Sequence, residues 1–170
     1  MLSLGVTLVS LFFPKNEIYF GILHFLSISI LLFALIKKPI NKINTSTGLI
    51  TSALMFFITY GTAQRVLGIP KILSFSLPYS LYQNNCFFAL GFINSDFHSS
   101  DYFPMLPWFF AFLFGIFLGK YAKNGQFPEC MYKPRVRILS SAGKHTLIIY
   151  LVHQPVIFFL CYLCDILINQ

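Results

Sequence analysis

Three short groups of polar residues interrupt an otherwise apolar chain, and they are where chemistry could take place. The first group is His24 within Gly21-Ile22-Leu23-His24-Phe25, the second runs from Asp101 to Trp108, and the third is His153-Gln154-Pro155. Polar and ionisable side chains are costly in hydrocarbon, so each group needs a reason to be there. We therefore look for function at these three places.

His24 is the first candidate. A neutral imidazole could act as a general base toward an acceptor amine or hydroxyl. Gly21, one turn earlier, would let another backbone or a substrate approach. The structural alternative is an interhelical hydrogen bond, worth about 1 kcal/mol.

The Asp101 group is the second candidate. Asp101 is placed to cap the helix that follows it, and Pro104 is tolerated in a first helical turn. Tyr102 and Trp108 suit the aromatic belt at a membrane surface. Pro107 is less well explained, because it removes a backbone hydrogen bond at the helix entrance. The functional alternative is an outward-facing cavity lined by Asp101 and Tyr102.

The third group lies on the last apolar segment. Thr146, Tyr150 and His153 fall at i, i+4 and i+7, so they share one helix face. Pro155 cannot donate a hydrogen bond to the carbonyl of Leu151, which leaves an acceptor within the membrane. Such a polar stripe fits either a bundle interior that touches a polar ligand or a kinked packing helix with satisfied contacts.

Basic residues precede this last segment. Gly143-Lys144-His145 could hold a phosphate through helix-start amides and the lysine. The run from Lys133 to Arg137 could do likewise, although membrane orientation and anionic lipids would also explain it. The candidate phosphate-binding residues are Lys133, Arg135, Arg137 and Lys144.

Composition identifies the class of protein. The chain has 170 residues, of which 56% are hydrophobic and 10% charged, whereas a soluble domain carries about 25% charged residues. This indicates an integral membrane protein forming a single domain over residues 1–170. Cys161 and Cys164 lie one helical turn apart without other soft ligands nearby, so we expect no metal site.

The apolar segments predict an all-α polytopic transmembrane bundle with about four full spans. Met1 to Phe13 is too short to cross the bilayer by itself. It is interpreted as the end of a longer helix and counted as a short N-terminal span. The stretch from Arg65 to Ser100 contains Pro70 and Pro78 and no spanning apolar run, so its part from Ser74 to Phe92 is interpreted as an interfacial or re-entrant segment. The full helices are expected at about 18–36, 48–63, 103–121 and 144–168.

The basic residues predict the orientation. Alternating helices place nine lysines and arginines on one side and three on the other, so the first side should be cytoplasmic. The C-terminus and the loop from Arg65 to Ser100 then face outward. The net charge of +7 is mostly an orientation signal, and no nucleic-acid partner is implied.

The three groups, in this order, resemble a known family. Gly21 through Ser29, Asp101 through Trp108, and Gly143 through Pro155 look like motifs of the bacterial membrane family related to the heparan-alpha-glucosaminide N-acetyltransferase catalytic domain. The last motif is also similar to one in membrane acyltransferases that modify surface sugars. This resemblance implies a protein of the bacterial inner membrane that takes an acetyl group from cytoplasmic acetyl-CoA. The acceptor would be an amino sugar or other glycan on the outer side.

The resemblance also assigns expected roles. His24, Asp101 and His153 would be catalytic, with the first two near the acceptor and His153 on the path between the two sides. Substrate contacts are expected from Tyr102, Trp108, Tyr150 and Gln154, and contacts to acetyl-CoA from the basic residues named above.

One departure from the family suggests an alternative. Family members carry further helices before the Gly21 segment, so this chain is expected to be N-terminally truncated or one half of a split gene. A second chain would then supply the missing helices. The alternative function is a non-catalytic membrane protein that acts in assembly or in the passage of a small solute.

Overall fold

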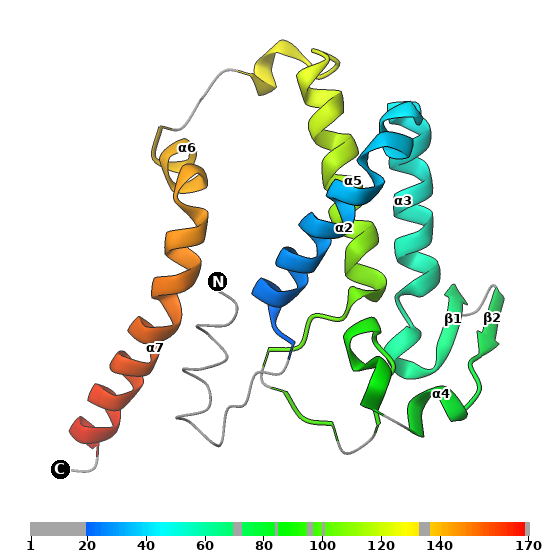
Figure 1. The fold of residues 1–170 in the computed structure, drawn as a ribbon. Coiled ribbons are helices and arrows are strands. Elements are labelled where there is room, and N and C mark those ends of the chain that lie inside the picture. Colours follow the sequence, from blue (N-terminus) through cyan, green and yellow to red (C-terminus); the bar gives the residue numbers. More distant parts are fainter. Residues whose placement is uncertain are drawn as a thin grey trace. The chain divides into compact units, whose positions relative to one another are not determined.

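A computed structural model describes residues 20–69, 73–83, 85–94, 97–99, 101–132 and 137–168 (Figure 1). The chain divides into two compact units, Met1–Gln126 and Phe127–Gln170, and each is described by itself. The expected short span at Met1 to Phe13 lies outside the described residues.

Helix α2 covers Ile22–Lys42 and begins after Gly21, whose backbone is extended (φ −83°, ψ 177°). The expected end at Lys37-Lys38-Pro39 is wrong, because the helix continues through Pro39 to Lys42. A proline fixes φ at about −65°, which a helix accepts, and it withholds only one backbone hydrogen bond. The Lys37 and Lys38 side chains are exposed, so the added turn buries no charge.

Helix α3 covers Thr45–Thr59, so it begins three residues before the expected start at Gly48. Asn44 explains the early start, because its Oδ1 accepts a hydrogen bond from the Ser46 N–H at 3.1 Å. The expected end at Ala63 is too late. The chain leaves α3 at Tyr60 and forms a short 3₁₀ turn, η1, over Thr62–Gln64.

Helix α5 covers Met105–Lys123, close to the expected range of 103–121. Its first turn is irregular, since Leu106 has a non-helical backbone (φ −97°, ψ 124°). Helices α3 and α5 pack closely where Gly48 meets the buried ring of Phe117. At the C-terminal ends of α2 and α5, Lys120 Nζ donates to the carbonyl of Ile40 at 3.3 Å.

Two of the described helices, α2 and α5, are long and apolar enough to cross a membrane. The bundle of about four spans therefore stays a prediction beyond these two helices.

The described residues are mostly helical, as predicted, and a small sheet lies in the connection between α3 and α5. Strands β1, Val66–Ile69, and β2, Leu73–Ser76, form an antiparallel two-stranded sheet. A short helix α4, Ser80–Gln83, and a 3₁₀ segment η2, Asn85–Leu90, follow. The segment from Ser74 to Phe92 thus has the broken backbone that Pro78 and the lack of a spanning apolar run predicted, whereas its position in a membrane stays a prediction.

The second unit contains η3, Glu129–Met131, α6, Arg137–Lys144, and α7, Thr146–Ile168. The last predicted helix is confirmed with a start two residues later than expected. The basic segment before it is helical from Arg137 onward, and Gly143-Lys144 ends α6 rather than forming a loop before α7. His145 is the turn between the two helices.

Candidate functional site

Asp101 lies at the start of α2, far from it in sequence. The Ile22 N–H donates to Asp101 Oδ2 at 3.3 Å, and the Phe103 N–H donates to the Phe20 carbonyl at 2.9 Å. The expectation that Asp101 caps the following helix is therefore wrong. Its carboxylate caps α2, whereas α5 begins after Pro104 without a side-chain cap.

His24 lies in the first turn of the same helix and is half-buried. Its ring packs at 6.2 Å from the ring of Phe20. The first and second polar groups of the sequence therefore meet at one helix end. We call this region, residues 20–25 with 101–105, the α2 entrance. Unpaired amides and the helix dipole favour a negative charge at such an end, which suits the carboxylate of Asp101.

Aromatic side chains form one wall of the α2 entrance. The Tyr102 hydroxyl donates to the Phe88 carbonyl at 2.5 Å, and the Phe97 ring lies 5.1 Å from the Tyr102 ring. The Phe88 ring meets Phe20 edge-on at 6.1 Å. Burial raises the pKa of Tyr102 well above its usual range, so its hydroxyl stays protonated and remains a donor. Sequence reasoning missed Phe88 and Phe97, because nothing distinguishes them among 21 phenylalanines.

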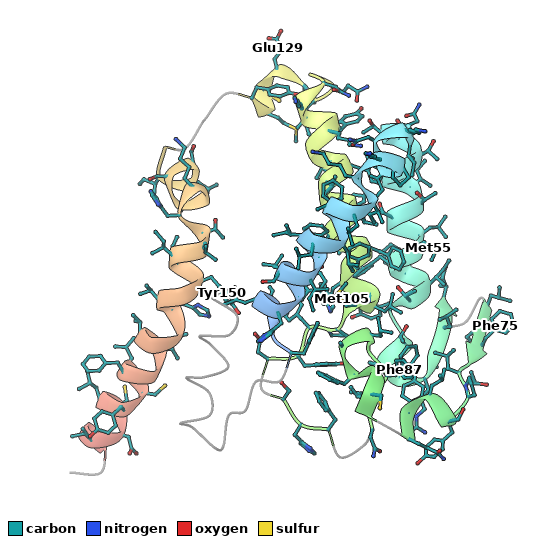
Figure 2. All side chains as sticks on the ribbon, in the orientation of Figure 1. Met55, Phe75, Phe87, Met105, Glu129 and Tyr150 are labelled. Atoms are coloured by element: carbon teal, nitrogen blue, oxygen red, sulfur yellow. The ribbon has the colours of Figure 1, made fainter. Side chains whose placement is uncertain are left out.

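A small core supports the entrance. Phe20, Phe25 and Met105 are buried together, and Figure 2 shows Met105 at the beginning of α5. The Trp108 ring lies 4.8 Å from Phe103 and also packs against α3 through Phe56. The observed contacts of Trp108 are thus with the protein, and its role toward a substrate stays a prediction.

The third polar group belongs to the second unit. His153 Nδ1 lies 2.5 Å from the carbonyl of Tyr150, and the two rings are 5.3 Å apart. A carbonyl only accepts, so Nδ1 carries the proton and Nε2 presents a lone pair in the neutral ring. The Thr146 hydroxyl donates to the Gly143 carbonyl at 2.8 Å. The structure therefore brings Tyr150 and His153 together, whereas the Gln154 and Pro155 side chains lie outside what it describes.

The candidate phosphate-binding residues are only partly described. Lys133 and Arg135 fall outside the described residues, as does the Arg137 side chain, while Lys144 is exposed in the last turn of α6. Within the described part of the chain, no three histidine, cysteine or acidic side chains are grouped to hold a metal ion. Cys86, Cys130, Cys161 and Cys164 are reduced and exposed.

Comparison with known proteins identifies the family. A family model described as "Heparan-alpha-glucosaminide N-acetyltransferase, catalytic" matches residues 1–155, a stretch that contains all three polar groups. Comparison with curated proteins and with solved structures gave no match. Because the family model covers most of the chain and two apolar helices accompany it, the protein belongs to the heparan-alpha-glucosaminide N-acetyltransferase catalytic-domain family.

Proposed function

We propose that this chain is a membrane acetyltransferase that moves an acetyl group from cytoplasmic acetyl-CoA to an extracytoplasmic amino sugar or other glycan. The family match supports acetyl transfer, and the apolar helices α2 and α5 support a membrane location. The observation that carries the assignment of a site is the hydrogen bond from the Ile22 N–H to Asp101. It joins two family motifs, distant in sequence, at one helix end.

The charge distribution of the first unit supports the direction of transfer. The bond from Lys120 to Ile40 ties the C-terminal ends of α2 and α5 together, and lysines gather at that end. The lysines are Lys37, Lys38, Lys42, Lys120 and Lys123. The α2 entrance lies at the other end of these helices (Figure 1). By the positive-inside rule, the lysine end faces the cytoplasm and the α2 entrance faces outward.

The chemistry assigned to the α2 entrance is removal of a proton from the acceptor. Bound acetyl-CoA supplies the acetyl group as an activated thioester. His24 accepts the proton that the acceptor amine loses as its nitrogen forms the amide bond and the thioester carbon–sulfur bond breaks. The thiolate that leaves takes up a proton. Asp101 holds the start of α2 in place and positions the acceptor amine by its negative charge.

The remaining assignments follow the same scheme. Tyr102 and Trp108 shape the acceptor side of the site through their contacts with Phe88 and Phe103. The family resemblance assigns His153 and Gln154 to the path of transfer, and the Tyr150 ring packs against the His153 ring. The phosphates of coenzyme A fit the cationic residues, and Lys144 is exposed to receive one.

The test is acetylation of a glucosamine-ended acceptor by membranes supplied with labelled acetyl-CoA. His24→Ala should lower the rate by about 10²- to 10⁴-fold, the usual contribution of a general base. Ser27→Ala is the matched control, because Ser27 lies one turn further along α2 and its hydroxyl donates to the carbonyl of its own helix at Leu23, at 2.8 Å. If His24→Ala and Ser27→Ala acetylated the acceptor at the same rate as the unsubstituted chain, His24 would not be the general base.

A further inference from the structure

The hairpin of β1 and β2 has one wholly apolar face. In the observed register Leu67 pairs with Phe75 and Ile69 pairs with Leu73, whereas Val66 pairs with Ser76 and Gly68 with Ser74. Directly paired residues share a face, and faces alternate along each strand. One face is therefore made of four large apolar side chains. We call it the apolar hairpin face: Leu67, Ile69, Leu73 and Phe75.

The β2 side of this face is more exposed than the β1 side. Leu67 is half-buried, Ile69 is 37% exposed, and Leu73 and Phe75 are 63% and 62% exposed. Leu73 and Phe75 are therefore the least covered side chains of this face within the first unit. Neither strand carries a charged residue, so nothing on the face itself recognises a charged partner.

The surroundings of the hairpin point to lipid as the partner. β1 follows α3 after the short turn η1, and Phe57 in the last turn of α3 and Tyr60 just after it are exposed. The base of the hairpin carries Arg65, whose guanidinium lies 4.6 Å from the centre of the exposed Tyr79 ring. Tyrosine with arginine is typical of the boundary between lipid and water. Exposed apolar side chains at the end of α3 are thus followed along the chain by the apolar hairpin face and by an arginine–tyrosine pair of the kind found at membrane interfaces.

The unpaired backbone groups at the edges of the hairpin limit how deeply it can enter a bilayer. A two-stranded sheet has open edges whose N–H and C=O groups lack ladder partners. Such edges are not tolerated in the hydrocarbon core, but water and headgroups can satisfy them in the interfacial region. We infer that the apolar hairpin face lies in the membrane interface, with Leu73 and Phe75 against the upper acyl chains of the bilayer and Ser74 and Ser76 facing water. This inference rests on the membrane location and not on acetyl transfer.

Tryptophan fluorescence tests the inference. Trp108 is the only tryptophan in the sequence, so Phe75→Trp and Ser74→Trp are each made in a Trp108→Phe background. The two positions are neighbours on opposite faces of β2. In nanodiscs of lipid brominated near the glycerol end of the acyl chains, Phe75→Trp should be quenched roughly twofold or more beyond Ser74→Trp. Equal quenching would overturn the inference. Weak quenching of Phe75→Trp would also overturn the inference, because the side chain would then contact water or a second protein chain instead of lipid.

A second comparison applies if a tryptophan variant does not fold. Leu73→Cys and Ser74→Cys are labelled with a water-soluble maleimide in unsealed membrane fragments, above the background of the unsubstituted chain. Ser74→Cys should react roughly threefold or more faster, because the thiolate must meet the reagent in water. Faster or equal labelling of Leu73→Cys would contradict burial in lipid.

Discussion

At the scale of single residues, Asp101 joins a structural and a proposed chemical role. Its carboxylate accepts from the Ile22 N–H and so caps α2, and the same group lies at the helix end that carries His24. Replacement by alanine would remove both roles at once. An experiment that separates them must keep an oxygen acceptor at this position while removing the charge.

Asp101→Asn makes that separation. The asparagine side chain can still accept from the Ile22 N–H, so the thermal midpoint in detergent should stay near that of the unsubstituted chain. The acetylation rate should nevertheless fall by about 10²-fold, because the negative charge that positions the amine is gone. Asp101→Ala should lose the same activity and also about 1 kcal/mol of stability. Full activity in Asp101→Asn would limit Asp101 to capping.

Tyrosine burial predicts sensitivity to alkaline pH. Burial raises the pKa of Tyr82 above its ordinary value of 10.0, although the nearby Arg65 partly offsets this, and burial raises the pKa of Tyr102 as well. Above the ordinary value the folded state holds protons that the unfolded chain has lost, so unfolding releases protons. The free energy of unfolding should therefore fall as the pH rises from about 10 upward.

Thermal midpoints measured from about pH 8 to about pH 11 check this prediction. Tyr102→Phe should lose about 1 kcal/mol at pH 8, the worth of its hydrogen bond to Phe88, but should show a shallower decline at high pH. An identical alkaline slope in both proteins would contradict the assignment to Tyr102.

At the scale of elements, the packing of α3 against α5 depends on a glycine. A Cβ at Gly48 would overlap the ring of Phe117, which is buried between the helices. The same Phe117 ring also lies 5.1 Å from Lys120 Nζ, the residue that bonds to the end of α2. Loss of this close approach would therefore loosen all three helices.

Gly48→Ala tests that packing. The new methyl group should destabilise the protein by about 1–3 kcal/mol, despite the better helix propensity of alanine. Gly115→Ala on α5 is the matched control, because a Cβ there meets nothing within 4 Å, and it should leave the thermal midpoint unchanged or slightly higher. Adding Phe117→Leu to Gly48→Ala should recover part of the loss. If both alanine variants melted alike, close packing at Gly48 would be refuted.

The hairpin shows what element prediction missed. Val66-Leu67-Gly68-Ile69 and Leu73-Ser74-Phe75-Ser76 are each four residues long, and short apolar runs do not distinguish a strand from a helix by periodicity. In addition, β1 begins only after Arg65 adopts a left-handed backbone (φ 63°). Few residues other than glycine adopt that conformation. An arginine at this position therefore gave no sign in the sequence that the chain turns before the strand. The break in regular helix was nevertheless predicted from Pro70, Pro78 and the lack of a spanning apolar run, whereas the interfacial position stays a prediction.

At the scale of the whole molecule, the orientation in the membrane is predicted from the charge distribution. Lysines gather at the C-terminal ends of α2 and α5, whereas Asp101 lies at the α2 entrance. The first end is predicted to be cytoplasmic. Native cysteines provide probes, since the exposed Cys86 lies in η2 before α5, and the exposed Cys130 follows the lysine end of α5.

Labelling of intact cells with an impermeant maleimide checks the orientation. With Cys161 and Cys164 replaced by serine, Cys86 should react from outside, and Cys130 should react only after the membrane is opened. Cys86→Ser and Cys130→Ser identify each signal. If Cys130 reacted in intact cells and Cys86 did not, the orientation would be the opposite of the predicted one. The proposed direction of transfer would then be wrong.

Composition and local pattern alone predicted a membrane protein, the approximate positions of α2, α3, α5 and α7, and the polar groups worth testing, although α2 extends to Lys42 instead of ending near residue 36. These features are local, because apolar runs and costly polar residues can be recognised without knowing what they contact. Only the tertiary structure decided which helix Asp101 caps, that Tyr102 donates to Phe88, and that Gly48 receives Phe117. Each of these contacts joins residues distant in the chain, and their pairing depends on how the helices pack rather than on any local pattern.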